Sequence, residues 1–317
     1  MAKNDYGHLL KTLQAKKGPA GLYAEPLLWM ESKDLEAFNA HFWYGFIKRS
    51  GPCHPLAGAL THPYDECLIF AGLDHTDIRY LGAEISIALG EEQEEHVFSE
   101  PSVLVIPKGM PHGPVTVRRL DKPIVHYGFA LGTEYVATSI PDGAKPSQTT
   151  GSKHRHLIKK LITHVDPDRV GTGMGYERIV DAEGILRPAD GGIGPGNADQ
   201  LVWLFGKDLE GLEVNFTWGF YSRCGKWHRA GESHIHPEEE ILVLVGIDPD
   251  DLGYLGAELE MGMGDERHIF NKPTVIICPK GFPHLPQITR WVDKPYGFFV
   301  INLSGEHDSP WVEAEES

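Results

Sequence analysis

The chain has 317 residues, of which 41% are hydrophobic and 23% charged, and its formal net charge at pH 7 is −16. This length allows two soluble domains of ordinary size, each with its own core. The negative charge argues against binding to nucleic acid, because no basic stripe is present to neutralise phosphates, and against docking on an anionic membrane.

The first segment, residues 1–28, is polar and is expected to form a tail with at most a short helix. It lacks the apolar core and cleavage site of a signal peptide, and no apolar run of the chain is long enough to span a bilayer. The four cysteines, Cys53, Cys67, Cys224 and Cys278, form no CxxC pair. We therefore expect a cytoplasmic protein with reduced thiols.

The sequence of the segment 29–139 is repeated within residues 201–317. A shift of 174 positions (236 − 62 = 174) places Trp29 on Trp203 and His62 on His236. After two extra residues in the first copy, a shift of 172 (284 − 112 = 172) places His112 on His284. Chance does not produce so long a colinear series, so the chain contains a tandem duplication. We assign one domain to each copy and a connector to residues 140–200.

Each copy has the pattern of an all-β domain. The apolar runs SVLVI (102–106), ILVLV (241–245) and TVIIC (274–278) are rich in β-branched residues and predict strands. AELEMGM (257–263) alternates in polarity, which predicts a strand with one buried face. Within the connector, only KHRHLIKKLITHV (153–165) has the pattern of a helix.

The second copy contains a set of potential metal ligands in GESHIHPEEEILVLVG (231–246) and PKGFPH (279–284). His234 and His236 lie two residues apart, so on a strand they point to the same face. Glu240 follows as the next strand begins, and His284 can close the site from another strand. Three imidazoles and one carboxylate suit a divalent Mn, Fe, Co, Ni or Zn ion and leave positions open for substrate, water or dioxygen.

The patterns HxHxxxE and PxGxxH in these segments resemble the two signature motifs of the cupin superfamily, and the duplication resembles the bicupins. The resemblance covers about residues 29–129 and 203–303. It implies an all-β fold of two tandem cupin barrels (double-stranded β-helix or jelly-roll) with short helical connectors. It also implies that His234, His236, Glu240 and His284 bind a metal inside the second barrel. Because cupins include dioxygenases, decarboxylases, isomerases, hydrolases and metal-free binding proteins, the reaction stays open.

The first copy departs from this ligand pattern. It retains His62, Glu66 and His112, but Leu60 stands where the second copy has His234. Three ligands can hold a metal in a two-histidine, one-carboxylate arrangement, yet the leucine directs an apolar side chain to the place of a ligand. We interpret the first barrel as structural, with a degenerate metal site. The expected cofactor is therefore one divalent transition metal, with no organic cofactor.

Three further residues of the second copy are candidates for moving protons beside the metal: His268, Glu258 and His228. The first copy has the same residue types at these places: His96, Glu84 and His54. Since only the second copy has the complete ligand set, this recurrence also allows a structural interpretation, such as a histidine bonded to a backbone carbonyl.

The function expected from these residues is metal-dependent C–C bond cleavage, of hydrolase or lyase type, in a small oxygen-rich substrate such as a β-dicarbonyl, enol or phenol. Such a substrate can place its oxygens on the open metal positions. Two alternatives stay open: an Fe(II)-dependent aromatic or enediol dioxygenase, and a non-catalytic ligand-binding cupin. The expected partner is a small molecule, and the protein is expected to be a monomer or homodimer.

Overall fold

The structure is a computed structural model that describes residues 5–19, 22–56, 58–140, 147–150, 152–164, 180–186, 196–227 and 233–312. The chain divides into two compact units. The N-terminal unit consists of residues 14–74 and 78–161, and the C-terminal unit of residues 1–13, 75–77 and 162–317. None of the helices in the described residues is long and apolar enough to cross a membrane.

The N-terminal unit contains two sheets. One has the strand order β15-β10-β7-β12-β4-β3-β2, and the other has the order β13-β6-β11-β8-β9-β14, with β5 also paired to β11. The bounds are β2 (Ala15–Lys16), β3 (Leu27–Met30), β4 (His41–Ile47), β5 (Gly51–His54), β6 (Leu60–Thr61), β7 (Glu66–Ala71), β8 (Ala83–Leu89), β9 (Glu94–Phe98), β10 (Ser102–Ile106), β11 (His112–Leu120), β12 (Ile124–Ala130), β13 (Thr138–Ser139), β14 (Ser147–Thr150) and β15 (Ile158–Lys160). Two 3-10 turns, η2 (Ser32–Asp34) and η3 (Arg155–Leu157), belong to this unit.

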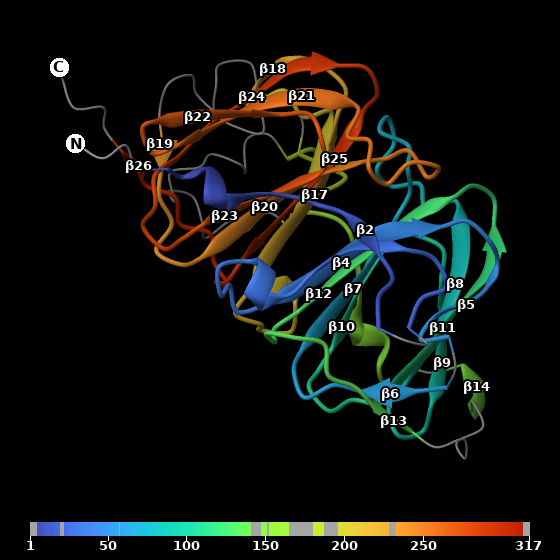
Figure 1. Cartoon of the computed structure of the whole chain (residues 1–317). Helices are drawn as coiled ribbons and strands as arrows, with labels where there is room; N and C mark the ends of the chain where they lie inside the picture. The colour runs from blue at the N-terminus through green and yellow to red at the C-terminus, as the bar shows by residue number, and fades with distance from the viewer. Residues whose placement is uncertain are drawn as a thin grey trace. The chain divides into compact units, whose positions relative to one another are not determined.

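The C-terminal unit repeats this arrangement (Figure 1). Its sheets have the orders β1-β23-β20-β25-β17-β16 and β22-β21-β24-β19-β26, with β18 also paired to β24. The bounds are β1 (Leu10–Thr12), β16 (Gln200–Leu204), β17 (Asn215–Tyr221), β18 (Gly225–Lys226), β19 (Ser233–His234), β20 (Glu240–Gly246), β21 (Ala257–Met263), β22 (Glu266–Phe270), β23 (Thr274–Cys278), β24 (His284–Val292), β25 (Tyr296–Asn302) and β26 (Trp311–Val312). The 3-10 turns η1 (Gly7–Leu9) and η6 (Gly206–Asp208) complete the described elements.

The expected all-β fold is confirmed, and the apolar runs form the expected strands. SVLVI is β10, TVIIC is β23, and ILVLV lies within β20. In β21 the buried residues Ala257 and Leu259 alternate with the half-buried Glu258 and Glu260, as the period of two predicts. The core of the N-terminal unit lies between its two sheets, because apolar side chains of β7 and of β8 belong to one buried cluster.

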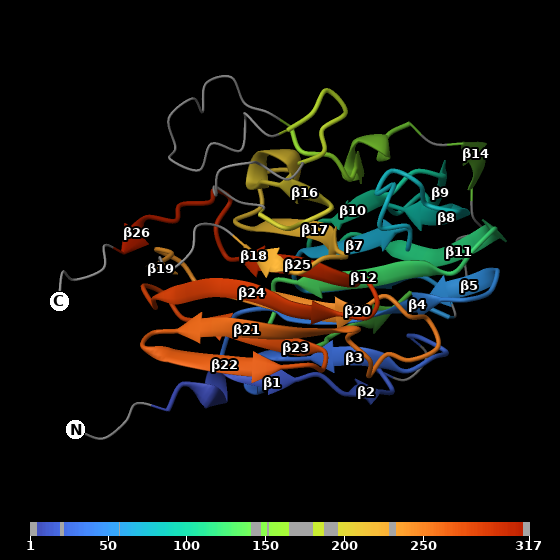
Figure 2. The same ribbon diagram turned by 90° about the horizontal axis from the view of Figure 1, so that it is seen from above.

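Two segments form strands where we expected a tail and a helix. Leu10–Thr12 is β1, which pairs antiparallel with β23 (Figure 2), and Ile158–Lys160 is β15, which pairs antiparallel with β10. The parts of the expected connector that lie outside the described residues are not assigned. A short isolated helix is marginal, whereas a strand here supplies hydrogen-bond partners to the open edges of β23 and β10.

These two added strands are themselves alike in sequence. GHLLKTL (7–13) and RHLIKKL (155–161) align at a shift of 148 (158 − 10 = 148), and each forms a 3-10 turn followed by a three-residue strand. β1 belongs to the C-terminal unit, although it precedes the first copy in the sequence. The duplicated block therefore begins with this strand, earlier than the self-comparison indicated.

Candidate metal centres

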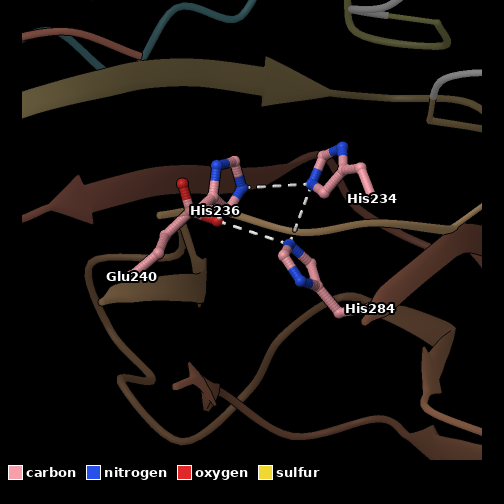
Figure 3. A group of neighbouring side chains, drawn as sticks. All are labelled: His234, His236, Glu240 and His284. Carbon is pink, nitrogen blue, oxygen red and sulfur yellow. Dashed lines mark hydrogen bonds and ion pairs between the residues drawn. The ribbon is translucent and has the colours of Figure 1, made fainter. Parts of the chain in front are cut away.

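The four predicted ligands of the C-terminal unit lie together (Figure 3). His234, His236, Glu240 and His284 are all buried, and one donor atom of each lies within 4.8 Å of the others. The Nε2 atom of His234 is 2.9 Å from His284 Nε2 and 3.2 Å from His236 Nε2. Glu240 Oε2 is 3.1 Å from His236 Nε2 and 3.5 Å from His284 Nε2.

The strands bring these side chains together. His234, on β19, lies directly opposite His284, the first residue of β24, in the antiparallel register. Glu240 is the first residue of β20 in the facing sheet. His236 Nδ1 donates to the carbonyl of Asp308 at 2.7 Å, and His284 Nδ1 donates to the carbonyl of Phe282 at 3.1 Å. These bonds orient both rings so that Nε2 faces the centre.

This arrangement fits a metal ion. An imidazole that donates from Nδ1 in its neutral form presents a lone pair at Nε2, so His236 and His284 direct lone pairs toward the same point as the Glu240 carboxylate. A shared cation satisfies these donors, and the set suits a divalent first-row metal. The structure therefore contains a group that could hold a metal, as the sequence predicted.

The electrostatics of the group favour an ionised glutamate. Burial by itself raises the pKa of Glu240, but His236 and His284 reverse this effect and hold the pKa well below its usual value. Burial likewise lowers the pKa of His236, but the neighbouring Glu240 outweighs it and the net pKa is raised. The Glu240 carboxylate is thus in its metal-binding form, whereas protons compete with a metal ion for His236.

A cavity with about 310 Å³ of empty volume adjoins the four ligands, and most of its wall is apolar. The apolar wall consists of Trp203, Trp227, Leu242, Leu285, Phe298 and Val300. Besides the ligands, the polar residues of the wall are Gln287 and His307. The His307 ring lies 4.7 Å from the His236 ring, centroid to centroid, and 4.4 Å from that of Trp203.

His307 is not among the catalytic residues predicted from the sequence. It follows the last long strand of the copy, outside both metal-binding motifs, and the corresponding residue of the first copy is Tyr135 (307 − 172 = 135). Tyr135 lies beside His62 as His307 lies beside His236. A signal was present in this difference, because the position holds a histidine beside the complete ligand set and a tyrosine in the first copy.

The structure does not bring His268 or Glu258, two of the three predicted catalytic residues, to this cavity. His268 lies on the edge strand β22, where its Nε2 is 3.0 Å from Glu266. Glu258, on β21, lies 3.5 Å from Arg290, and neither residue lines the cavity. The pairing of β22 outside β21 separates His268 from the ligand-bearing β19 and β24. His228 lies outside the described residues.

The N-terminal unit contains a second group of buried potential ligands: His54, Glu66 and His112. His62 adjoins it, with Nε2 3.5 Å from Glu66 Oε1, while His112 Nε2 is 3.3 Å from Glu66 Oε2. We expected His62, Glu66 and His112 near one another, but not His54. The suggestion that His54 bonds a backbone carbonyl was wrong, because neither of its ring nitrogens has a hydrogen-bond partner in the described residues.

The charge states of this group also suit metal binding. Burial holds the pKa of His54 well below its usual value, so its imidazole is neutral. Burial alone raises the pKa of Glu66, but His112 and His62 outweigh it and bring the pKa to about 2. Neutral imidazole and ionised carboxylate are the ligand forms of these side chains.

No protein-family model and no curated protein matches the sequence. Among solved structures, a variant of Bacillus subtilis oxalate decarboxylase OxdC matches with a TM-score of 0.56 at 10% identity, over 95% of this chain and 78% of that chain. Oxalate decarboxylase from Bacillus subtilis at pH 4.6 matches with a TM-score of 0.56 at 10% identity, over 95% and 77%. An oxalate decarboxylase structure described for its substrate binding mode gives 0.53 at 11% identity, over 95% and 78%. Because the likeness covers 95% of this chain and extends through both copies, the protein has the two-barrel fold of these oxalate decarboxylase structures.

Proposed function

We propose that the C-terminal centre is the active site of a metal-dependent enzyme that cleaves a C–C bond in a small oxygen-rich substrate. The observation that carries this proposal is His307, a side chain able to transfer protons, in a small cavity beside four buried metal-binding residues. The likeness to oxalate decarboxylase adds short carboxylic acids to the β-dicarbonyls, enols and phenols suggested by the sequence.

The metal and the side chains have separate parts in this proposal. A divalent ion held by His234, His236, Glu240 and His284 supplies a Lewis acid for the negative charge that develops on substrate oxygens. The apolar wall, which includes Trp227 and Phe298, excludes bulk water. His307 is placed to give a proton to the carbon from which the broken bond departs, or to take one from an attacking water.

The dioxygenase alternative also has an observation in its favour. Six apolar residues line the cavity, and an apolar pocket suits dioxygen chemistry at Fe(II). The preference for hydrolytic or lyase chemistry was based on His268, Glu258 and His228, and the first two lie elsewhere. Among the residues that the structure describes, this preference now depends on His307.

Turnover assays with and without dioxygen distinguish these reactions. The protein is loaded separately with Mn(II), Fe(II), Co(II), Ni(II) or Zn(II) and incubated with oxalate, oxaloacetate, acetylacetone or catechol. We expect one substrate class to be consumed at the same rate under nitrogen and in air, and His234→Ala to abolish that turnover. Dioxygen uptake equal to substrate loss would instead establish the oxygenase.

The matched control is His268→Gln, which changes a histidine of the same unit outside the cavity and should leave turnover unchanged. Tight binding of a candidate compound with no turnover under any metal would contradict the enzyme and support the non-catalytic cupin. Release of carbon dioxide identifies decarboxylation within the C–C cleavage class.

A further inference from the structure

We propose that the N-terminal unit holds a second metal ion, and that His54 supplies the ligand that is missing at Leu60. The full ligand set is His54, His62, Glu66 and His112. This inference concerns a different site from the proposed active site and does not depend on the reaction there.

Position 60 is the structural equivalent of the ligand His234. Leu60, on β6, lies opposite His112 in the antiparallel register, and His234 lies opposite His284 in the same way. The leucine is only 5% exposed and belongs to the apolar core cluster. A leucine has no donor atom, so this place in the first copy cannot contribute a ligand.

His54 approaches the same centre from another strand. It is the last residue of β5, which pairs with β11 further along that strand, at Val115. Its ring is completely buried, and its donor atom lies within 4.8 Å of those of Glu66 and His112. His54, whose equivalent in the second copy is His228, therefore gives this centre the composition of three imidazoles and one carboxylate found among the ligands of the C-terminal unit.

The position of His62 is conserved between the two centres. Its Nδ1 donates to the carbonyl of Val136 at 2.7 Å, which repeats the bond from His236 to Asp308 in the second copy. His62 Nε2 therefore faces Glu66. The orientation of a metal-binding histidine by a carbonyl is thus present in both units, although only one of them has the standard motif.

The unsatisfied ring nitrogens of His54 indicate that this residue acts as a metal ligand and not only as part of the packed core. Both of its ring nitrogens are buried without a hydrogen bond in the described part of the chain. Its ring lies 4.9 Å from that of Tyr23 and stacks on Trp43 at 6.2 Å, between centroids. Because buried polar atoms rarely lack partners, a ligand that satisfies His54 is expected, and Glu66 and His112 define where it lies.

A pocket lies near His54, although His54 does not itself line it. Its empty volume is about 460 Å³, and its wall includes Tyr23, Cys53 and His126. The rings of Tyr23 and His126 lie 4.9 and 5.9 Å from the His54 ring, between centroids. The donor set of the centre selects a divalent first-row ion.

Cobalt(II) titration tests the proposal, with the C-terminal centre removed by the paired substitutions His234→Ala and His284→Ala. We expect this background to bind Co(II) at one site per chain, with visible absorption bands from nitrogen and oxygen ligands. Adding His54→Phe, which keeps a ring between Tyr23 and Trp43, should weaken Co(II) binding at least about tenfold. Adding Leu60→His to that variant should restore binding, because the new imidazole occupies the place equivalent to His234.

The matched control is His126→Phe, since His126 is a neighbouring buried histidine and the second copy has Phe298 at this position (298 − 172 = 126). It should leave Co(II) binding unchanged, and circular dichroism confirms that each variant is folded. Unchanged binding in the His54→Phe variant, or equal loss in the control, would overturn the proposal. If the His54→Phe, Leu60→His protein folds but binds no metal, the claim that His54 takes the place of a ligand at position 60 is wrong.

Discussion

At the residue scale, the two centres differ in one aromatic side chain that lies next to an equivalent histidine ligand in each unit. In the C-terminal unit it is His307, which contacts His236, and in the N-terminal unit it is Tyr135, which contacts His62. An imidazole exchanges protons near neutral pH, whereas burial raises the pKa of Tyr135 above its already alkaline value. The proposed function therefore assigns proton transfer to the C-terminal centre.

Replacement of His307 tests this role. We expect His307→Gln to lower kcat by about 10²–10⁴-fold, the usual contribution of a general acid or base, with the metal content unchanged. Steady-state kinetics and metal analysis of the same sample measure both quantities. A variant that loses its metal, or one that keeps the full kcat, would remove His307 from the mechanism.

A second residue-scale prediction concerns pH and His126. Its Nδ1 donates to the Ile69 carbonyl at 3.0 Å, its Nε2 accepts from the Tyr23 hydroxyl at 2.8 Å, and burial lowers its pKa to about 4. Below the unfolded pKa of about 6.5, the unfolded chain binds a proton that the folded protein does not. Stability at this site is therefore lost as pH falls from about 6.5 to about 4.

His126→Phe removes this linkage. When the pH falls from 7 to 5, the free energy of unfolding of this variant should decrease by about 2 kcal/mol less than that of the unaltered protein. Urea unfolding at both pH values measures the difference. An identical pH dependence in the two proteins would show that His126 is not buried in its neutral form.

At the element scale, β1 and β15 complete one sheet in each unit. Each strand follows a 3-10 turn whose last residue is buried: Leu9 before β1 and Leu157 before β15. Because β1 belongs to the C-terminal unit and β15 to the N-terminal unit, equivalent leucines anchor different units. Their sequence likeness and equivalent burial provide a matched pair of substitutions.

We expect Leu9→Ala and Leu157→Ala each to destabilise one unit by about 2–4 kcal/mol, because each removes a buried leucine side chain. Hydrogen exchange followed by mass spectrometry locates the effect. Leu9→Ala should speed exchange in β23 and β20, and Leu157→Ala in β10 and β7. Faster exchange in the opposite unit, or no change, would show that these strands do not secure their own sheets.

At the scale of the whole molecule, two copies of one fold carry two groups of buried metal-binding side chains. Both groups place histidines and an ionised glutamate where burial disfavours uncompensated charge. A bound ion compensates this charge only in the folded state, so metal binding and folding stability are linked in each unit.

Removal of metal should therefore lower the thermal stability of the whole protein. At a free metal concentration about 100 times Kd, binding at one site contributes about 2.7 kcal/mol, which a chelator removes. Calorimetry with and without chelator measures this loss. The His234→Ala, His54→Phe double variant is the control. If the chelator lowers its stability by the same amount, the stabilisation does not come from metal bound at these two centres.

The amino-acid sequence by itself determined the duplication, the β-strand pattern and the four ligands of the C-terminal centre. These features are encoded by short periodicities and fixed spacings: alternate residues share one face of a strand, so His234 and His236 face one point. The buried runs of β10, β20 and β23 are equally local, because apolar β-branched residues suit a strand with buried faces.

Only the tertiary structure decided which distant side chains meet. His307 reaches the C-terminal cavity from a segment after the last long strand, and His54 reaches Glu66 and His112 from a strand that carries no metal motif. β1 and β15 exist as strands because β23 and β10 offer them open edges, which local helical patterning cannot reveal. Conversely, His268 has the right residue type for catalysis, but strand order places it at the edge, away from the ligands. Contacts between segments far apart in the sequence depend on sheet order and register, and these are fixed by the packing of the complete chain.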